Sequence, residues 1–330
     1  MMDSIYNILR NKTVLITGAT GLIGQALVKR LISKDVIVIA VVRNLEKAIS
    51  IFGCNLPITY LASDVTDLEV KKMDVDYIIH AASNTSSKAF ISNSVGVINT
   101  ALEGTKRTLE IARLSDVKGY VFPSTMEVYG TPLTDEKIDE QHGTNLDTMK
   151  SRSAYPESKR MCECLCASYN GQYGVPSKVI RLTQTFGPEV QYNDGRVFAE
   201  FARCVIERRD IVLHTRGETK RSYLYTEDAV DAILTVLVRG KVGEAYNAAN
   251  EDTYCSIYEM AQMVAKDCGE GKIKVRIEES DLATLGYAPT LHVNLDTTKL
   301  GYLGWKAKVG LVDMYRKMIA EMKTRRGINA

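Results

Sequence analysis

The first 125 residues alternate between short, almost continuous apolar runs and stretches with helical periodicity. Apolar runs occupy residues 13–17, 36–42, 58–61 and 77–79, and another begins at 119–122; helical periodicity is found over 22–33 and 95–114. Strands that are apolar on both sides must be covered on both faces, and strands that alternate with helices pair in parallel. The pattern predicts an α/β fold with a doubly wound parallel sheet.

Composition excludes several classes of partner and site. The 330 residues carry 42 Lys and Arg against 40 Asp and Glu, a net charge of +2, which favours neither nucleic acid nor a membrane surface. No apolar run approaches the length of a membrane span, so no such span and no secretory leader are expected. The 7 cysteines and 4 histidines show no metal-ligand spacing, so no metal is expected. Free thiols indicate a cytoplasmic protein.

The most informative motif is a spaced-glycine turn directly after the first apolar run. Glycines at this spacing allow a tight turn and close approach of a pyrophosphate, and the helix that follows directs free N–H groups at the phosphates. A simple strand-to-helix turn is the alternative, but the flanking strands and helix favour a Rossmann-like dinucleotide site. The predicted cofactor residues here are Gly18, Thr20, Gly21, Leu22, Ile23 and Gly24.

Two further strand ends supply candidate cofactor contacts. Asp64 and Val65 follow the third strand, where a carboxylate could accept the adenine amino group; a cap for the segment 66–72 explains Asp64 equally well. The small residues Ala81, Ala82 and Ser83 follow the fourth strand and would let the backbone lie against a flat cofactor. Any tight strand end could have the same composition.

A tyrosine and a lysine four residues apart form the candidate catalytic pair. Tyr155 and Lys159 share one helix face, with Pro156 tolerated in the first turn. A phenol with a pKa near 10 acts as a base near neutrality only if cations stabilise the phenolate, as a lysine one turn away would. Helix surface is the ordinary explanation of such a pair; the glycine turn makes catalysis the better one.

The fifth strand is followed by Pro-Ser-Thr-Met-Glu-Val-Tyr-Gly at 123–130. The Thr125 hydroxyl could hydrogen-bond the sugar oxygen that is oxidised, and Glu127 could relay a proton. The alternative is a turn in which Thr125 only caps the next segment.

Beyond about Gly187 the alternation becomes irregular, with loops rich in Gly, Asn and Asp at 191–196 and a new segment at 208–225. We expect residues 1–186 to form the dinucleotide-binding domain, with parts of 220–250 rejoining it as an open alternative. Residues 187–330 would mainly form a smaller C-terminal α/β substrate-binding portion.

Together these residues resemble the extended short-chain dehydrogenase/reductase family, specifically its sugar-nucleotide epimerases, dehydratases and decarboxylases. The resemblance covers nearly the whole chain, and the glycine turn, Thr125, Tyr155 and Lys159 match the family's cofactor and catalytic positions. Segment 181–188 is similar to the turn beside the substrate nucleotide, segment 220–229 to the one whose arginine, here Arg221, reaches the diphosphate, and 303–305 to the C-terminal signature. The resemblance implies a nicotinamide cofactor, a sugar-nucleotide substrate and a homodimer.

Within the family the chain most resembles UDP-glucuronate decarboxylases. The similar features are Glu127, Arg152 three residues before the tyrosine, and Asn-Asp-Gly-Arg-Val at 193–197, with Arg196 and Val197 as substrate contacts. Dehydratases share the glutamate but have an acid where this chain has Met126, which has no proton to donate. The resemblance implies oxidation at C4 with Tyr155 as the base, followed by loss of the C5 carboxylate, with Arg152 holding that carboxylate, Glu127 assisting at the enolate and Arg221 at the diphosphate.

Two departures from the family pattern leave alternatives open. Gln184 replaces the usual asparagine of the substrate turn, so the nucleotide base is undecided. The second strand ends in Val-Arg-Asn, and Arg43 in place of an acid admits a 2′-phosphate, so NADP is not excluded although NAD is expected. His214, before the loop 216–218, is a candidate for stacking on the base, with a solvent-facing strand residue as the alternative.

Other reactions remain compatible with these residues. The same side chains could support an NDP-sugar 4-epimerase, or a dehydratase or reductase. A non-catalytic dinucleotide-binding module is a remote alternative, because such a module has no need of a tuned phenolate.

Overall fold

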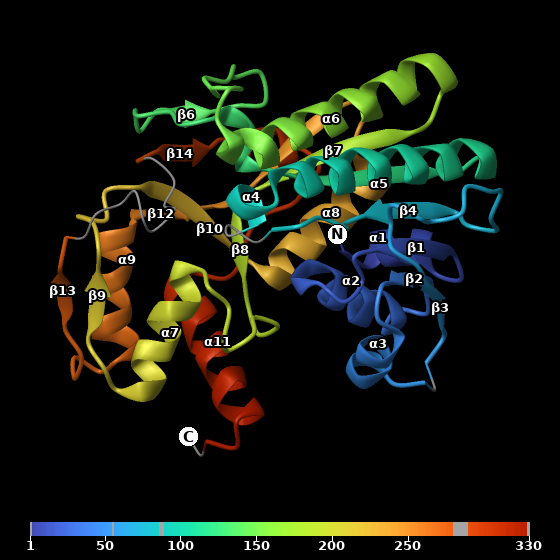
Figure 1. Cartoon of the computed structure of the whole chain (residues 1–330). Coiled ribbons are helices and arrows are strands. Elements are labelled where there is room, and N and C mark those ends of the chain that lie inside the picture. The colour runs from blue at the N-terminus through green and yellow to red at the C-terminus, as the bar shows by residue number, and fades with distance from the viewer. Residues whose placement is uncertain (1, 55, 86–88, 280–289, 329–330) are drawn as a thin grey trace.

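The large sheet of the molecule is parallel and doubly wound. The computed structural model describes residues 2–54, 56–85, 89–279 and 290–328 (Figure 1). Its 7-stranded sheet has the order β11-β7-β5-β4-β1-β2-β3, and every neighbouring pair is parallel. This confirms the predicted fold class. The strands are β1 (Thr13–Thr17), β2 (Ile37–Val42), β3 (Ile58–Ala62), β4 (Tyr77–His80), β5 (Gly119–Thr125), β7 (Ser177–Leu182) and β11 (Ala245–Ala248).

Helices cover both faces of this sheet because successive strand residues point to opposite sides. In β1, Val14 and Ile16 pack into one core and Leu15 into the other. The first face carries α1 (Met2–Leu9), α2 (Leu22–Ile32), α3 (Leu45–Phe52) and α8 (Thr226–Arg239). The second face carries α5 (Ser94–Ser115) and α6 (Ala154–Tyr173), which lie side by side in Figure 1, with the short α4 (Ala89–Ser92) at the start of α5.

The predicted strands and helices of the first 125 residues all occur, with small differences in their bounds. The fifth strand continues to Thr125, so this residue ends the strand rather than following it. The helix α1 was not predicted, because one short apolar face gives little periodicity to detect; its Ile5, Tyr6 and Leu9 are buried. Residues 66–72 contain only a turn.

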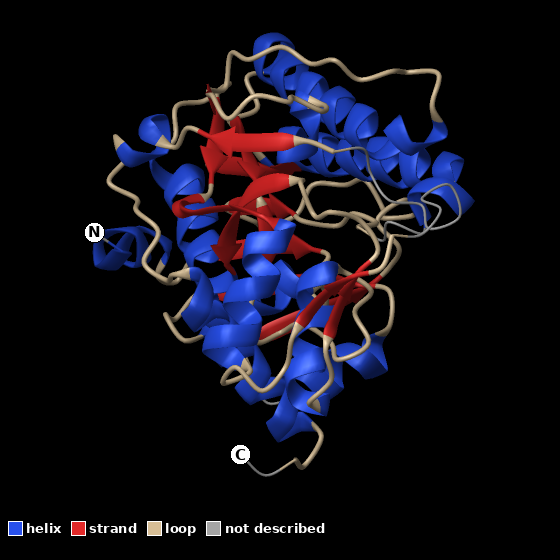
Figure 2. Cartoon of the chain, turned by 90° about the vertical axis from the view of Figure 1, so that its left-hand side faces the viewer, coloured by secondary structure: helices blue, strands red, loops and turns tan. Residues whose placement is uncertain are grey.

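A second group of elements lies at the carboxyl ends of several large-sheet strands. A 5-stranded sheet has the order β12-β10-β14-β6, with β8 paired to β10, and a 2-stranded sheet pairs β13 with β9. Figure 2 shows the helices near the C-terminus as a lower part of the molecule, and Figure 1 shows β6 and β14 above them. The strands are β6 (Lys137–Ile138), β8 (Gln184–Phe186), β9 (Ile211–Leu213), β10 (Lys220–Tyr225), β12 (Asn250–Ser256), β13 (Val275–Ile277) and β14 (His292–Leu295); the helices are α7 (Val197–Glu207), α9 (Ile257–Met263), the π-helix η3 (Val264–Cys268) and α11 (Leu311–Arg325). The short α10 (Thr298–Gly301) packs on β11 of the large sheet.

The chain passes between the two parts more than once. Strands β6 and β8 belong to the smaller sheet although they precede residue 187, whereas α8 and β11 pack on or join the large sheet although they follow it. The division at 186/187 therefore stays a prediction about function and is not a single crossing of the chain. Among the described residues, no helix is both long and apolar enough to cross a membrane.

Candidate active site

The glycine turn closes tightly against the end of β4. Gly18 has a φ of +67°, and a Cβ there would lie 2.8 Å from backbone atoms of Ala81 and Ala82. A Cβ on Gly24 would lie 2.1 Å from the Gly18 carbonyl oxygen. Only glycine fits either position, because the backbone segments already touch. The structure thus brings the predicted cofactor residues Gly18, Gly24, Ala81 and Ala82 together at the carboxyl edge of the sheet.

The helix α2 begins inside this turn. Gly21 is its N-cap residue and Leu22 its first residue, followed by Ile23, so the first backbone N–H groups of α2 face the turn. The Thr20 carbonyl accepts a hydrogen bond of 2.9 Å from the Gln25 side chain, which ties the turn to the helix. Ser83 lies half-buried just beyond Ala82. This is the arrangement expected for a phosphate cradle.

Thr17 and His80 form a buried pair at the same strand ends, which was not predicted from the sequence. The Thr17 hydroxyl lies 2.7 Å from His80 Nδ1 and accepts a hydrogen bond of 3.1 Å from the Ala82 N–H. Burial, with the charge of Lys159, lowers the pKa of His80 to about 3, so the ring is neutral. Thr17 and His80 are register partners of β1 and β4. Since each residue ends its strand, correct strand pairing would have found the contact.

At the ends of β2 and β3 the structure shows a capped turn. Asp64 accepts hydrogen bonds from the backbone N–H of Thr66 at 3.0 Å and from its hydroxyl at 2.9 Å. The pKa of Asp64 is lowered. The hydrogen bond from the Thr66 N–H has the largest effect, the charge of Arg43 also lowers this pKa, and burial raises it. Arg43 lies 3.9 Å from the Asp64 carboxylate with 82% of its side chain exposed, and Val65 packs against Gly104. The capping interpretation of Asp64 is therefore observed, and its contact with adenine stays a prediction.

The candidate catalytic residues meet at the end of β5. Thr125 ends the strand, Tyr155 lies in the first turn of α6, and the Thr125 hydroxyl is among the groups that lower the pKa of the Tyr155 phenol. Tyr155 is 8% exposed. Burial, and then the charge of Glu127, raises the pKa of Tyr155, while the Thr125 hydrogen bond and the charges of Arg152 and Arg196 lower it. Thr125 also accepts a hydrogen bond of 3.3 Å from the Glu127 N–H, so it caps as well as contacting the phenol.

Lys159 lies in the same buried site, but it is not among the main groups that shift the pKa of the Tyr155 phenol. Its Nζ donates to the Pro123 carbonyl oxygen at 2.8 Å and lies 4.4 Å from the centre of the Phe122 ring. Burial lowers the pKa of Lys159 to about 8. The cations that lower the Tyr155 pKa are Arg152 and Arg196, and stabilisation of the phenolate by Lys159 stays a prediction.

Glu127 and Arg152 form an ion pair beside the tyrosine. Glu127 lies in the 3₁₀ turn η1 (Met126–Tyr129) and Arg152 in η2 (Ser151–Ser153), and their side chains meet at 2.9 Å, about a quarter exposed. Glu157, the surface acid that could have held Arg152, instead lies 3.6 Å from Arg160. The two residues most specific to the predicted decarboxylase therefore contact each other next to Tyr155.

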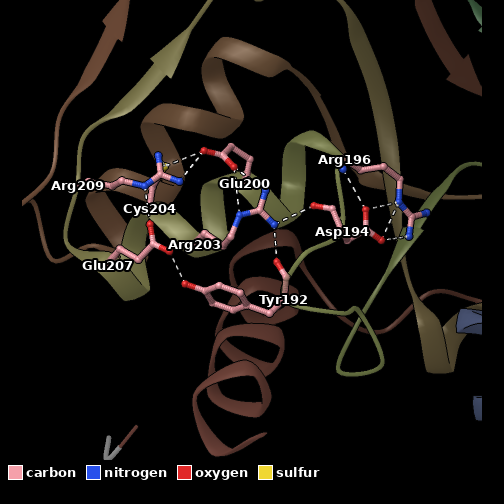
Figure 3. A network of polar contacts seen from close by, with 8 residues as sticks. All are labelled: Tyr192, Asp194, Arg196, Glu200, Arg203, Cys204, Glu207 and Arg209. Atoms are coloured by element: carbon pink, nitrogen blue, oxygen red, sulfur yellow. Dashed lines mark hydrogen bonds and ion pairs between the residues drawn. The ribbon is translucent and has the colours of Figure 1, made fainter. Parts of the chain in front are cut away.

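Arg196 is held at the start of α7 by a network of ion pairs (Figure 3). Its guanidinium contacts Asp194 at 2.6 Å, and its own N–H donates to the same carboxylate at 2.9 Å. Arg203, nearly two turns into α7, donates to the Asp194 carbonyl oxygen at 2.8 Å and to that of Tyr192, and pairs with Glu200. The turn at 192–196 is thus fixed to α7, which begins at the predicted contact Val197.

The other predicted substrate residues lie on the smaller sheets. Gln184 is the first residue of β8 and is the register partner of Tyr223 in β10. Arg221, also in β10, has a buried Nε with no hydrogen-bond partner among the described residues. His214 follows β9 and is half-buried, so the solvent-facing alternative does not describe it fully. No measured contact joins these three residues to Tyr155, and their roles stay predictions.

The cysteines form no disulfide and no metal cluster in the described structure. All 7 are free thiols, and Cys162 and Cys166 are buried residues of α6. In the part of the chain that the structure describes, no group of three or more His, Cys, Asp or Glu side chains is placed to hold a metal ion.

Comparison with known proteins agrees with this geometry. The sequence profile described as "NAD dependent epimerase/dehydratase family" matches residues 14–249. The chain is 30% identical over 267 residues to UDP-glucuronic acid decarboxylase 1 of Xenopus tropicalis, covering 79% of this chain and 61% of that protein. It is 28% identical over 327 residues to UDP-glucuronic acid decarboxylase 5 of Arabidopsis thaliana, covering 97% and 92%.

Solved structures with the same fold include two enzymes of different activity. UDP-glucose 4-epimerase of Thermotoga maritima, solved with UDP-glucose, superposes with a TM-score of 0.82 at 22% identity, covering 96% of this chain and 100% of that one. The dTDP-glucose 4,6-dehydratase DesIV of Streptomyces venezuelae, solved with NAD, gives 0.79 at 20% identity, covering 96% and 98%. At this identity the likeness establishes the fold alone. By its sequence match, its sheet topology and its glycine turn, the chain belongs to the NAD-dependent epimerase/dehydratase family.

Proposed function

We propose that the chain is a sugar-nucleotide enzyme that decarboxylates UDP-glucuronate through a 4-keto intermediate, with NAD as cofactor. The observation that carries the proposal is the Glu127–Arg152 ion pair beside the buried phenol of Tyr155. An ion pair at this position supplies a cation for a substrate carboxylate and an acid–base group next to the tyrosine. The relatives described as UDP-glucuronic acid decarboxylases support the same choice.

The residues present fit a dinucleotide. A side chain at Gly18 or Gly24 would collide with backbone atoms, so the turn can form only with glycine at these positions. The N-terminus of α2 adds free N–H donors. The turn, with Ala81 and Ala82, would hold the pyrophosphate, and Lys159 would bind near the nicotinamide end. When bound, the nicotinamide accepts a hydride from C4 of the sugar and later returns it.

The side chains of the site would handle the protons and the carboxylate. Tyr155, whose pKa the Thr125 hydroxyl lowers, takes the proton of the C4 hydroxyl as that carbon is oxidised. The ketone then accepts the electron pair of the breaking C5–carboxylate bond as an enolate, and carbon dioxide leaves. Arg152 positions the carboxylate before it leaves, and Glu127 assists protonation of C5, which replaces the lost group.

Positive charge for the diphosphate would come from two other arginines. Arg221 has a buried Nε without a hydrogen-bond partner among the described residues, a costly state for a cation that an anionic ligand would relieve. Arg196 is fixed by Asp194 and Arg203 at the start of α7. In this proposal Gln184 and His214 contact the nucleotide base.

The preference for NAD over NADP is part of the proposal. An enzyme that reoxidises its own cofactor in each cycle gains nothing from the more reduced NADP pool. Arg43, however, is 82% exposed and close to Asp64, where it could meet a 2′-phosphate. We expect purified protein to retain NAD. Tightly bound NADP, or an affinity for NADP that collapses in Arg43→Ala, would reverse the assignment.

We also propose that the chain works as a homodimer in the cytoplasm. Helices α5 and α6 lie side by side, and each exposes an apolar side chain, Val95 by 68% and Met161 by 52%, that a second copy could cover. The free cysteines suit a reducing compartment. Light scattering after gel filtration tests the dimer: a mass of twice 36.6 kDa is expected, and a monomer at working concentration contradicts it.

The reaction is tested by incubating the protein with a panel of sugar nucleotides and following the products by mass. With UDP-glucuronate we expect carbon dioxide and a UDP-pentose, strongly reduced in Arg152→Ala. If uronates are ignored and neutral hexoses interconvert at C4, the 4-epimerase alternative replaces decarboxylation. Dehydration is disfavoured because Met126, 4% exposed beside Thr125, cannot protonate a leaving hydroxide.

A further inference from the structure

A phenylalanine outside every predicted motif touches two residues of the site at once. The Phe90 ring stacks on the Tyr155 ring with centroids 4.3 Å apart and an interplanar angle of 12°. The Arg152 guanidinium carbon lies 4.8 Å from the centre of the same Phe90 ring. Phe90 is 2% exposed and forms a small apolar cluster with Val97 and Tyr155. One side chain of α4 therefore bridges the proposed base and the proposed carboxylate-binding cation.

Few other contacts constrain these two groups relative to each other. The Thr125 hydroxyl acts on the phenol of Tyr155, and Glu127 pairs with Arg152, but both partners act on the polar ends of the side chains. A near-parallel ring contact fixes the plane of the phenol, and a cation over a ring fixes the guanidinium laterally. The apolar ring also excludes water from the space between a base and a cation.

From this geometry we infer that Phe90 is a positioning residue, which holds Tyr155 and Arg152 in the mutual arrangement that proton transfer and carboxylate binding require. The inference rests on the proposed function for the identity of the substrate, but the ring contacts themselves do not depend on it. A displacement of about 1 Å at a reacting group can cost on the order of 100-fold in rate, so an aromatic support of this kind has a measurable kinetic effect.

The kinetic test uses a series of substitutions at Phe90 in the full chain. Phe90→Ala and Phe90→Leu should each lower kcat by about 10- to 100-fold, with a smaller change in KM, because the planar contact is lost in both. Phe90→Tyr keeps the ring and should restore kcat to within about threefold of the parent. Ile91→Ala, at the next residue of α4 and 47% exposed, is the matched control and should leave kcat unchanged. If Phe90→Leu turns over like the parent, the residue only fills space and the inference is wrong.

A second readout needs no turnover and separates this inference from the proposed reaction. For each protein, the phenolate absorbance of Tyr155 is isolated by subtracting the titration of the same protein that also carries Tyr155→Phe. Charges face Tyr155 from η1 (Glu127), η2 (Arg152) and the start of α7 (Arg196), and all three are retained in Phe90→Ala. Removing the ring changes both the burial of the phenol and the position of Arg152, so the Tyr155 titration should shift in Phe90→Ala and stay in place in Ile91→Ala.

The two readouts distinguish a failure of the proposed function from a failure of the role assigned to Phe90. A protein that ignores every sugar nucleotide of the panel but shows the shifted titration loses the proposed function and keeps the Phe90–Tyr155 support. A protein that decarboxylates UDP-glucuronate with an unmoved titration and an active Phe90→Leu variant keeps the proposed function and loses the role of Phe90. Thermal unfolding of each variant verifies that the compared proteins are folded.

Discussion

At the scale of single residues, burial in the site disfavours the charged forms of its ionisable groups. Burial raises the pKa of Tyr155 and lowers the pKa of Lys159 to about 8. Both changes favour neutral side chains in the resting protein. A phenol that must lose a proton during the reaction therefore depends on nearby cations, of which Arg152 and Arg196 are the ones that act on it here.

Replacing the phenol hydroxyl tests the proposed base directly. Tyr155→Phe should bind cofactor and substrate like the parent but lose roughly 100- to 10,000-fold in kcat, since only proton transfer is removed. Tyr173→Phe, at the exposed end of the same helix, is the control and should keep full activity. Steady-state kinetics with calorimetric affinities make the comparison; a Tyr155→Phe protein with near-parental kcat would remove the tyrosine from the mechanism.

The lowered pKa of Lys159 predicts how stability changes with pH. Its folded pKa of about 8 lies below the ordinary 10.5, so between these values the unfolded chain binds more protons. The free energy of unfolding of the parent, measured relative to Lys159→Met, should therefore rise with pH across this window, by on the order of 1 to 3 kcal/mol. Urea unfolding at several pH values measures the difference.

Lys178 provides a matched control for that experiment. It is also buried, donates to the Leu237 carbonyl oxygen at 2.7 Å, and has a pKa lowered to about 8, but it lies outside the site. Lys178→Met should change the pH dependence of stability in the same direction and leave kcat intact. A flat stability difference for Lys159→Met from pH 8 to 10.5 would show that its ammonium is not held at low pKa.

At the scale of elements, the cofactor site is made by backbone approach at the ends of β1 and β4. A Cβ at Gly24 would meet the Gly18 carbonyl oxygen at 2.1 Å, whereas one at Gly21 would meet that oxygen at 3.2 Å. The two glycines therefore serve different purposes. Gly24 lets the turn fold, and in the proposed function Gly21 would leave room for the pyrophosphate beside the first turn of α2.

This difference predicts two separable defects. Gly24→Ala should destabilise the protein by at least about 2 kcal/mol, because backbone must move to admit the methyl group. Gly21→Val should stay folded but lose NAD affinity. Gly171→Ala, whose Cβ would meet nothing within 4 Å, is the control for both. Thermal unfolding and calorimetric titration with NAD separate the effects, and unchanged affinity in Gly21→Val would contradict the cofactor site.

The elements of the first half could be predicted because their signals are local. Each buried strand is one apolar run, and Pro156 in the first turn of α6 marks the helix that carries Tyr155 and Lys159. Contacts across the chain left no local signal. Phe90 on Tyr155 joins residues 65 positions apart, and the Glu127–Arg152 pair depends on two short 3₁₀ turns. Glu157 was the nearer partner for Arg152 in sequence, but in the structure it faces Arg160.

At the scale of the whole molecule, the smaller sheet lies at the carboxyl edge of the large one, so a substrate would lie between the two parts. The chain passes between these parts at β6, β8, α8 and β11, which fixes them to each other through the backbone as well as through side-chain packing. Arg221 in β10 and Arg196 at the start of α7 belong to the smaller part, whereas Thr125, Tyr155 and Lys159 belong to the large one. Diphosphate binding and catalysis are therefore assigned to different parts of the molecule.

This assignment predicts separable kinetic defects. Arg221→Met should raise KM for the sugar nucleotide by about 10-fold or more with little change in NAD affinity, because its charge would serve only the diphosphate. Arg239→Met, on the exposed end of α8, is the control. Steady-state kinetics with the substrate found in the panel, together with calorimetric titration with NAD, measure both quantities. Loss of NAD affinity in Arg221→Met, with KM unchanged, would contradict the assignment.

The central claim is that the chain oxidises C4 of UDP-glucuronate, releases the C5 carboxylate and returns the same hydrogen to C4. UDP-glucuronate carrying deuterium at C4 tests all of it when the reaction is run in ordinary water and the product is analysed by mass and by NMR. We expect carbon dioxide and a UDP-pentose that retains deuterium at C4 and has gained one solvent hydrogen at C5. A product with solvent hydrogen at C4, or unreacted uronate from a protein that interconverts UDP-hexoses at C4, would contradict it.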